Sequence, residues 1–336
     1  MERFYPENAV IAAPLSGYTD LPFRRALRRA GCFFAFTEMV DVSSIACNNP
    51  GCQTLLLRGP EEPWLGVQLV GSNLEHLKIA VDTVNERDFD VLDFNLGCPV
   101  PKVARKHAGA ALGRDVEHAL ECFGVIAARS RFPVTAKIRI LDESDPAPTI
   151  ALVRGLAELG ARAVTIHGRV MASFYSGPVR GEIIAACREA VKVQVVANGG
   201  IMSGEDCRNL RRDTGCDAVM VARGMMGNPW LFREIADGEK FVPPALTEWA
   251  ELMRFQVEEM TALYGESAGM CMARKIVLDY LRGRGFGGAV KNRAARLRTL
   301  AEFRAFAAEL ETNGPAPSYW DNMPRARRLT RLASVR

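Results

Sequence analysis

Residues 163–200 read AVTIHGRVMASFYSGPVRGEIIAACREAVKVQVVANGG, and this stretch decides the fold. Two short apolar runs, Ala163–His167 and Val193–Asn198, are separated by an amphipathic segment. Neither run alternates strictly between apolar and polar residues, which is typical of parallel strands that are buried on both faces. A strand, an amphipathic segment and a second strand predict one β-α-β unit.

The same order repeats from the N-terminus to about residue 236. The chain contains eight candidate strands: Ala9–Ala13, Phe33–Thr37, Leu65–Val70, Val91–Asn95, Val134–Ile138, Ala163–His167, Val193–Asn198 and Ala218–Ala222. Eight strand–helix units favour a closed α/β fold, the (β/α)8 TIM barrel, over an open doubly wound sheet. No Gly-x-Gly-x-x-Gly follows the first run, which also argues against a dinucleotide-binding open sheet.

Helix starts are predicted between these runs. Asp20 before Pro22 and Asn228 before Pro229 are typical helix entries. Ser72 with Glu75 predicts a capping box, in which each side chain accepts a hydrogen bond from the other residue's backbone N–H.

The C-terminal part has helical periodicity and no strand candidates. Asp237–Leu246 contains a glycine and two prolines and is interpreted as a linker. Beyond it, Thr247–Tyr264, Ala268–Arg282 and Val290–Leu310 predict three helices. We therefore expect a barrel domain over 1–240 and an all-α helical-bundle domain over 245–336, with an irregular tail from Asn313.

Charge is unevenly distributed along the chain. Met270–Arg336 holds 14 Lys and Arg against 5 Asp and Glu, although the net charge of the whole chain is only +4. A basic end on a mildly acidic body predicts a polyanionic partner, with solvated basic helix faces as the structural alternative.

Cysteine usage and hydropathy limit the class of protein. Nine cysteines without a zinc-type spacing predict no metal site and a reducing, cytoplasmic compartment. No apolar run reaches 18 residues and no signal sequence is recognised, so we expect no membrane contact. A monomer is expected.

Candidate binding and catalytic residues lie at the C-terminal ends of the predicted strands, where barrel enzymes carry their chemistry. They are Pro14, Leu15, Gln68, Asn95, Cys98, Lys137, Arg139, His167, Arg169, Asn198, Gly199, Gly200, Arg223 and Gly224. Each alone has a structural explanation, such as a rim salt bridge or a hydrogen-bonded core histidine. Together, in register with the strands, they predict a ligand site.

The last two strand ends predict a phosphate site. Barrels often bind phosphate with the loops after strands 7 and 8. Gly199-Gly200 and Arg223-Gly224 lie there, and glycines let backbone N–H groups approach an anion; tight turns are the alternative. A cofactor with one terminal phosphate, such as FMN, fits this arrangement, with Lys137 and Gln68 beside the flavin ring.

Cys98 lies between Gly97 and Pro99, just past a strand. An unperturbed thiol has a pKa of about 8.5, so it is mostly protonated at neutral pH. It is therefore a candidate proton donor as well as a nucleophile. A packed structural thiol is the alternative.

An ordered series of motifs carries a family resemblance over nearly the whole chain. The series is Ala13-Pro14, Gly17-Tyr18-Thr19-Asp20, Thr37-Glu38-Met39, Val67-Gln68-Leu69, Gly71-Ser72, Asn95-Leu96-Gly97-Cys98-Pro99, Lys102-Val103, Arg105-Lys106, Ala108-Gly109, Lys137-Ile138-Arg139, Thr165-Ile166-His167-Gly168-Arg169, Ala197-Asn198-Gly199 and Gly227-Asn228-Pro229-Trp230. With these motifs the chain resembles the tRNA-dihydrouridine synthases, the bacterial branch most closely.

The resemblance implies a flavin-dependent oxidoreductase. FMN lies at the barrel rim, NADPH reduces it, and hydride then passes to C6 of a uridine in tRNA while Cys98 protonates C5. Lys137 matches the family lysine that contacts flavin and substrate, and the helical domain binds tRNA. Substrate or RNA binding is assigned to Asn95, Arg105, Lys106, Arg139, Arg169, Arg274 and Lys275.

Three positions depart from the family pattern. Leu15 replaces a methionine beside the flavin, and Ile140-Leu141-Asp142 replaces Thr-Gly-Trp after the fifth strand. Gly200 replaces an aspartate near the cofactor. Three other functions remain open: an FMN reductase acting on a free pyrimidine or other small molecule, a flavin-free lyase or aldolase that uses Lys137 as a Schiff base, and an RNA-binding protein without catalysis.

Overall fold

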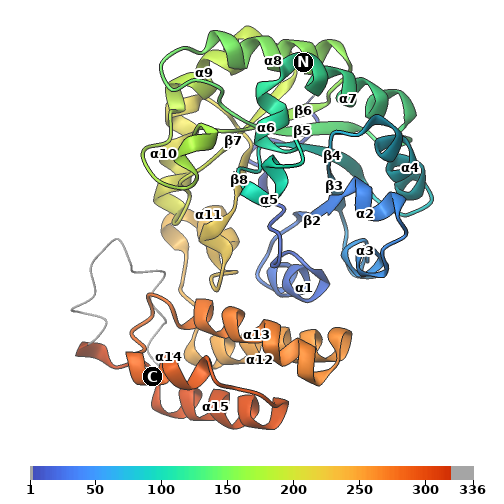
Figure 1. The fold of residues 1–336 in the computed structure, drawn as a ribbon. Coiled ribbons are helices and arrows are strands. Elements are labelled where there is room, and N and C mark those ends of the chain that lie inside the picture. Colours follow the sequence, from blue (N-terminus) through green and yellow to red (C-terminus); the bar gives the residue numbers. More distant parts are fainter. Residues whose placement is uncertain (1–2, 319–336) are drawn as a thin grey trace. The chain divides into compact units, whose positions relative to one another are not determined.

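A closed parallel barrel forms the core of the protein. The computed structural model describes residues 3–318, and its eight strands pair in the order β1 to β8, with β8 returning to β1 (Figure 1). The strands are β1 (Val10–Ala12), β2 (Phe34–Asp41), β3 (Leu65–Val70), β4 (Val91–Leu96), β5 (Val134–Arg139), β6 (Ala163–His167), β7 (Gln194–Asn198) and β8 (Val219–Val221). The predicted TIM barrel is confirmed, and each of the eight predicted runs overlaps one strand.

β2 differs most from its prediction because it continues to Asp41 after a register shift between Phe36 and Met39. Thr37 and Glu38 interrupt the apolar pattern there, yet both are buried. A polar residue inside a barrel does not end a strand if its hydrogen bonds are satisfied.

Helices connect the strands. They are α1 (Leu21–Arg29), α2 (Val42–Ala46), α3 (Pro50–Leu55), α4 (Leu74–Asn85), α5 (Pro101–Ala104), α6 (Ala110–Arg114), α7 (Val116–Arg129), α8 (Ala147–Glu158), α9 (Gly181–Ala190) and α10 (Gly204–Thr214), with the 3-10 turn η1 (Met171–Ser173). α4 is capped by Asn73, whose Oδ1 accepts the His76 N–H at 2.9 Å. The predicted Ser72 cap is therefore wrong by one residue, since Ser72 donates instead to the Lys106 carbonyl.

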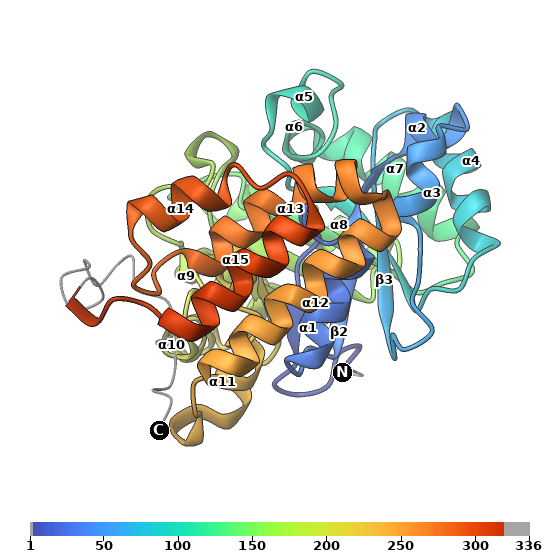
Figure 2. The ribbon, with the colours of Figure 1, turned by 90° about the horizontal axis from the view of Figure 1, so that it is seen from below.

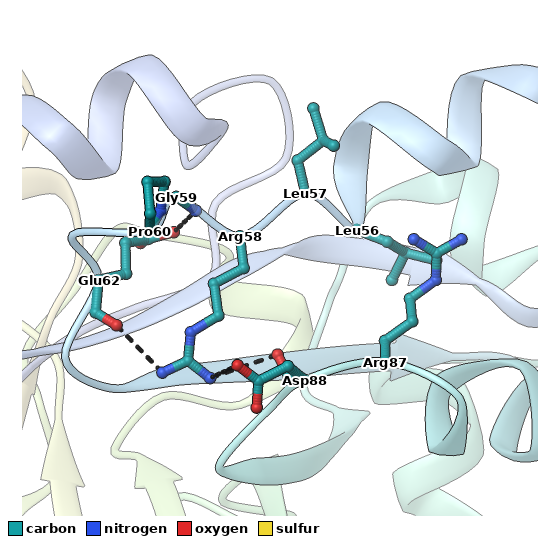
Figure 3. A pocket seen from close by; sticks show the side chains of 8 residues that line it. All are labelled: Leu56, Leu57, Arg58, Gly59, Pro60, Glu62, Arg87 and Asp88. Carbon is teal, nitrogen blue, oxygen red and sulfur yellow. Dashed lines mark hydrogen bonds and ion pairs between the residues drawn. The ribbon is translucent and has the colours of Figure 1, made fainter.

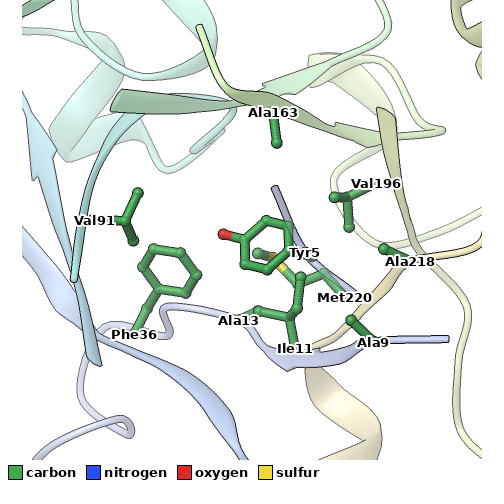
Figure 4. Packing of buried hydrophobic residues seen from close by; sticks show 10 residues of the cluster. All are labelled: Tyr5, Ala9, Ile11, Ala13, Phe36, Val91, Ala163, Val196, Ala218 and Met220. Atoms are coloured by element: carbon green, nitrogen blue, oxygen red, sulfur yellow. The ribbon is translucent and has the colours of Figure 1, made fainter. Parts of the chain in front are cut away.

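An apolar cluster fills the N-terminal end of the barrel (Figure 4). Tyr5 lies among Ile11, Phe36, Val91 and Met220, all nearly fully buried. The backbone of Tyr5 exchanges two hydrogen bonds with the Gln194 side chain, at 2.8 and 3.1 Å. Residues before β1 therefore close this end, and the opposite end is left to the polar side chains.

The chain divides into two compact units. The first contains the residues up to Leu21, Phe33–Ile201 and Asp206–Ala222. The second contains Pro22–Cys32, Met202–Glu205 and the described chain from Arg223 on. The second unit thus includes α1, whose Arg25 pairs with Glu259, and the early residues of α10.

The second unit is otherwise helical. Its elements are η2 (Arg223–Met225), α11 (Leu231–Asp237), η3 (Gly238–Lys240), α12 (Leu246–Tyr264), α13 (Glu266–Leu281), α14 (Gly288–Ala294) and α15 (Leu300–Asn313). α12 packs against both α13 and α15 (Figure 2). Trp249 of α12 stacks on Phe286 at 5.2 Å between ring centroids. The predicted all-α C-terminal part is confirmed.

The predicted single helix Val290–Leu310 is wrong, because the chain forms α14 and α15 there. Thr299 caps α15 in a capping box with Glu302. The capping box satisfies two backbone N–H groups and so marks the start of a separate helix. Of the irregular tail predicted from Asn313, residues 319–336 lie outside the described part.

Candidate active site

The barrel interior changes from apolar to polar along strands such as β4 and β6. Successive residues of a strand point to opposite faces, so alternate residues line the interior. On β4 the buried interior series is Val91, Asp93 and Asn95, and on β6 it is Ala163, Thr165 and His167. The C-terminal end of the barrel therefore holds a buried polar layer above the apolar cluster, which is where barrel enzymes bind their substrates.

Cys98 is held by its backbone on both sides. Asn95 Oδ1 accepts the N–H groups of Gly97 and Cys98, at 3.0 and 2.9 Å. The Cys98 carbonyl accepts the Ala110 N–H at 2.9 Å. Gly109 has φ +62°, and a Cβ there would lie 2.7 Å from the Cys98 carbonyl oxygen. The loop therefore needs a glycine at 109, and the position of the thiol is well determined.

The electrostatic surroundings keep Cys98 protonated. Six of the nine cysteines are buried and Cys47 and Cys271 are exposed, whereas Cys98 is partly buried. Burial raises the pKa of the Cys98 thiol from its usual 9.0, and the Val100 backbone N–H, Lys137 and Arg139 only partly oppose this shift. A thiol that stays protonated at neutral pH can donate a proton.

Lys137 lies at the same end of the barrel. Its Nζ donates to Asn198 Oδ1 at 3.1 Å, and Asn198 Nδ2 donates to the Met220 carbonyl at 2.7 Å. Burial, and secondly the nearby Arg139, lower the pKa of Lys137 from 10.5 to about 8. An anionic neighbour would therefore stabilise the charged form of Lys137.

Arg139 joins two of the rim loops. It is 3% exposed, and it donates from Nε to the Gly97 carbonyl at 2.8 Å and from Nη1 to the Val170 carbonyl at 3.2 Å. The first of these bonds supports the Cys98 loop. Arg139 therefore brings a fixed positive charge to the site, as its predicted role in substrate binding requires.

His167 is the last residue of β6, and Arg169 lies in the loop that follows it. Arg169 Nη1 and His167 Nε2 are 3.3 Å apart, and Arg169 Nε and Nη2 both donate to the Gly177 carbonyl. Gly199 has φ +126°, and a Cβ there would lie 2.9 Å from His167 Cδ2. Only glycine therefore lets the chain after β7 pass this close to the imidazole.

The predicted phosphate-binding glycines border a pocket of about 490 Å³. Gly199 and Gly200 share it with Glu182, Asp206 and Asp213. Three carboxylates on that wall oppose a phosphate on this side of the glycines. Arg223 is exposed and Gly224 is buried, both in η2 of the second unit. The phosphate site stays a prediction.

The remaining predicted residues are placed as follows. Pro14 is buried and Leu15 is partly buried after β1, and Gln68 is buried inside β3. Arg105 and Lys106 follow α5 and are exposed, and Lys106 pairs with Asp41 at 2.7 Å. Arg274 and Lys275 are partly exposed on α13 in the second unit. Their roles in cofactor or RNA binding stay predictions.

Asp93 was not singled out from the sequence. It is 1% exposed, and its carboxylate accepts from Thr135 Oγ1 at 2.6 Å and from Gln68 Nε2 at 2.7 Å. The signal was present in the sequence, because a charged residue interrupts the apolar run Val91–Asn95. Glu38, which accepts the Gly17 N–H, was also seen only as part of a motif.

A pocket of about 640 Å³ lies near the opposite end of the barrel, in the loops that precede β3 and β4 (Figure 3). Arg58 donates there to the carbonyls of Asp88 and Glu62 and pairs with Asp90 at 3.0 Å. Its charge is used to join two loops, which indicates a structural role.

Two negative observations apply to residues 3–318. Within this range no cluster of three or more His, Cys, Asp or Glu side chains has the arrangement of a metal site. None of the described helices is both long and apolar enough to cross a membrane.

The chain is similar to known proteins over most of its length. The model of the family "Dihydrouridine synthase (Dus)" matches residues 10–313. "tRNA-dihydrouridine synthase B" of Pseudomonas aeruginosa is 34% identical over 317 residues, which cover 91% of this chain and 95% of that protein. "Probable tRNA-dihydrouridine synthase" of Rickettsia prowazekii is 33% identical over 281 residues, covering 82% and 85% respectively.

A solved structure shares the fold. Histamine dehydrogenase from Rhizobium sp. 4-9 matches with a TM-score of 0.52 and 13% sequence identity, over 97% of this chain and 64% of that chain. At this identity the match concerns the fold alone. The family match and the two relatives confirm the resemblance found in the sequence. The chain therefore belongs to the dihydrouridine synthase family.

Proposed function

We propose that this protein reduces specific uridines in tRNA to 5,6-dihydrouridine, with FMN as cofactor and NADPH as reductant. Membership of the family and the names of the two relatives support the reaction and the substrate. One observation carries the proposal to this chain's residues: a thiol, Cys98, that its surroundings keep protonated beside two cations, Lys137 and Arg139.

The donor set fits FMN. Burial lowers the pKa of Lys137, an anion beside it would raise that pKa again, and a reduced flavin ring is such an anion. Lys137, Asn198 and His167 would hold the ring, with Gly199 and Gly200 offering backbone N–H groups. When bound there, FMN would supply the chemistry of hydride transfer to C6 of uracil, with NADPH as the source of the hydride.

Cys98 completes the reduction of the C5=C6 bond. Hydride addition at C6 leaves a carbanion at C5, and the S–H proton forms the new C5–H bond. The thiolate left behind lies close enough to Lys137 and Arg139 for both to lower the pKa of the thiol, and it regains a proton from solvent. Lys137 and Arg139 also stabilise negative charge on the uracil carbonyl oxygens.

A uridine stacked within folded RNA must leave its stack to reach this site. Extrusion costs a few kcal/mol. We propose that the helical part over 245–336 offsets this cost through phosphate contacts from Arg274 and Lys275, while the barrel over 1–240 performs the chemistry. Arg105, Lys106 and Arg169 would contact the RNA at the barrel rim. A tRNA substrate places the activity in the cytoplasm, and we propose that the enzyme acts as a monomer.

The test is a reaction with purified protein, FMN, NADPH and a tRNA transcript, followed by digestion and mass spectrometry of the nucleosides. We expect a uridine that has gained two hydrogen atoms, and no product from Cys98→Ala protein of equal flavin content. Reduction of free uridine with no reduction of tRNA would assign the protein to small-molecule flavin reductases. No product from either substrate would refute the proposal.

A Schiff-base lyase is the second candidate, because a lysine pKa of about 8 is also typical of an amine nucleophile. Borohydride would trap such an enzyme covalently with a carbonyl substrate at Lys137. A protein with the visible absorbance of oxidised flavin and no trapped adduct excludes this candidate.

A further inference from the structure

Asp93 is buried in the middle of β4, below the candidate active site. It occupies one register row with Gln68 of β3 and Thr135 of β5. Both neighbours donate to its carboxylate, at 2.7 and 2.6 Å. A carboxylate buried this deeply costs stability, so its presence calls for a reason beyond packing.

Hydrogen bonds continue from Asp93 towards the thiol loop. Gln68 Oε1 accepts from Asn95 Nδ2 at 2.7 Å. Asn95 Oδ1 accepts from the backbone N–H groups of Gly97 and Cys98. Three hydrogen bonds in sequence thus join the carboxylate to the backbone of Cys98 through two side-chain amides, and the bond from Gly97 branches from the second amide.

The two ends of this series of hydrogen bonds require the same direction of donation. An ionised carboxylate only accepts, so Gln68 must turn its NH₂ towards Asp93 and its oxygen towards Asn95. At the other end, backbone N–H groups only donate, so Asn95 must turn its oxygen towards the loop and its NH₂ towards Gln68. Both amides therefore have one permitted orientation.

We propose that Asp93 is a positioning residue for Cys98, which acts by fixing the orientation of the Gln68 and Asn95 amides and thereby the thiol loop. This inference rests on the proposed function, because it gives a role to a residue that does not touch substrate or cofactor. It predicts that the negative charge of Asp93 matters more than its volume.

The groups around Asp93 are consistent with a carboxylate at working pH. Burial raises the pKa of Asp93 to about 6, while Thr135, Gln68 and the cation Lys137 lower it. Tyr5 is the titratable group on the apolar side, and burial followed by the charge of Asp93 raises its pKa well above 10.0. Tyr5 is therefore neutral and Asp93 is mostly ionised at pH 7.5.

Asp93→Asn removes the charge and keeps the shape. An amide at 93 can donate to Gln68 as well as accept from it. The direction of donation can therefore reverse in every hydrogen bond of the series. In the reversed orientation Asn95 presents its NH₂ to Gly97 and Cys98, and two backbone N–H groups lose their acceptor. The thiol loop then has two competing arrangements instead of one.

The first measurement is alkylation of Cys98 by iodoacetamide in flavin-free protein, followed on the Cys98 peptide by mass spectrometry across a range of pH. Measuring the alkylation rate across pH gives two quantities separately: the pKa of the thiol, and the limiting rate at which its thiolate is alkylated. We expect Asp93→Asn to raise that limiting rate roughly fivefold, the factor that the loss of one net hydrogen bond gives. Thr135→Val is the matched control, because it removes a donor to the same carboxylate and leaves the Gln68 side unchanged.

The second measurement is activity. Asp93→Asn is expected to lower kcat for tRNA reduction roughly tenfold or more, with the tRNA Kd and the rate of flavin reduction by NADPH unchanged, since small misplacements of a reacting group cost up to about a hundredfold. Thr135→Val is expected to stay within about twofold of wild type. In a Gln68→Met background, Asp93→Asn should have no further effect on the alkylation rate, because the series of hydrogen bonds is already interrupted at residue 68.

The outcomes separate the two proposals. An unchanged alkylation rate and kcat in Asp93→Asn overturns the positioning role and leaves tRNA reduction intact. A wild-type protein that reduces no uridine overturns the function, and the alkylation rates still decide whether Asp93 positions Cys98. If Asp93→Asn does not fold, Gln68→Met interrupts the same series of hydrogen bonds at its middle. It is expected to raise the alkylation rate of Cys98 in the same way.

Discussion

Lys137 of β5 donates a hydrogen bond of 3.1 Å to Asn198 of β7, across the intervening strand β6. This bond spans the polar end of the barrel, and Cys98 lies close enough for the charge of Lys137 to lower the pKa of its thiol in part. A cation, an amide and a protonated thiol are thus collected from three strand ends.

Cys98→Ala should retain flavin and tRNA binding but lose most turnover. Replacing a general acid typically lowers a rate by about 10²- to 10⁴-fold. Rapid-mixing absorbance would follow flavin reduction by NADPH, which should be unchanged, and flavin reoxidation by tRNA, which should slow. Cys47→Ala is the control, because that cysteine is exposed and lies directly after α2. A kcat near wild type in Cys98→Ala would remove the acid role.

Lys137→Met should stabilise the fold at neutral pH. The folded pKa of Lys137 is about 8, below its usual 10.5, so between these values the unfolded chain binds more protons and stability rises with pH. Below pH 8 the full cost of burying the ammonium is present, on the order of 1–2 kcal/mol after discounting for partial exposure.

Urea unfolding at pH 6.5, 8 and 10 measures this effect. The advantage of Lys137→Met over wild type should be largest at pH 6.5 and should shrink towards pH 10. Lys192→Met changes an exposed lysine and should show no such trend. A difference that is constant with pH would mean that Lys137 is not desolvated. Activity should fall in Lys137→Met, since stability and function oppose each other at such sites.

The fold followed from the sequence because strands buried on both faces produce continuous apolar runs. The runs at Leu65–Val70 and Ala163–His167 match β3 and β6 residue for residue. β2 was underestimated because Glu38 interrupts the pattern, although Glu38 is buried and its carboxylate accepts the backbone N–H of Gly17. The break between α14 and α15 was missed because helical periodicity continues across it, and only the Thr299 to Glu302 spacing marks the new start.

The site was predictable only in part. Residues in the last part of a strand, such as Lys137, or just after one, such as Cys98, are located by topology alone, because parallel strands end at one rim. Asp93 needs more, since its partners depend on the register between β3, β4 and β5. That register is a property of the closed barrel and is not encoded in any one strand.

Gly109→Ala should displace Cys98. Gly109 has φ +62°, and the new Cβ would lie 2.7 Å from the Cys98 carbonyl oxygen. We expect a loss of about 1–2 kcal/mol in stability from the backbone conformation, together with a large fall in kcat. Gly160→Ala separates the two effects, because Gly160 has φ +93° and nothing within 4 Å of its Cβ. It should lose stability similarly and keep its kcat; equal losses of kcat in both variants would refute the contact.

Arg274→Ala combined with Lys275→Ala should weaken tRNA binding without affecting flavin reduction. Each phosphate contact that is lost should lower the slope of log Kd against log salt concentration by about 1. Filter binding at several salt concentrations measures this slope. Arg304→Ala is the control, because Arg304 pairs with Glu258 at 2.7 Å. An unchanged slope in the double variant would place the RNA contacts elsewhere on the protein.

Asp93→Asn should gain stability as it loses activity. The folded pKa of Asp93 is about 6, above its usual 3.8, so the folded state binds more protons between these values and wild-type stability falls as pH rises through them. The asparagine variant has no such loss. Its stability relative to wild type should therefore increase between pH 4 and 7, by on the order of 2–3 kcal/mol.

Urea unfolding at both pH values measures the change, and Thr135→Val, which keeps the carboxylate, should still lose stability over this range. A residue with a merely structural role would lose stability and activity together when replaced, whereas a positioning carboxylate gives up stability for the orientation of Gln68 and Asn95.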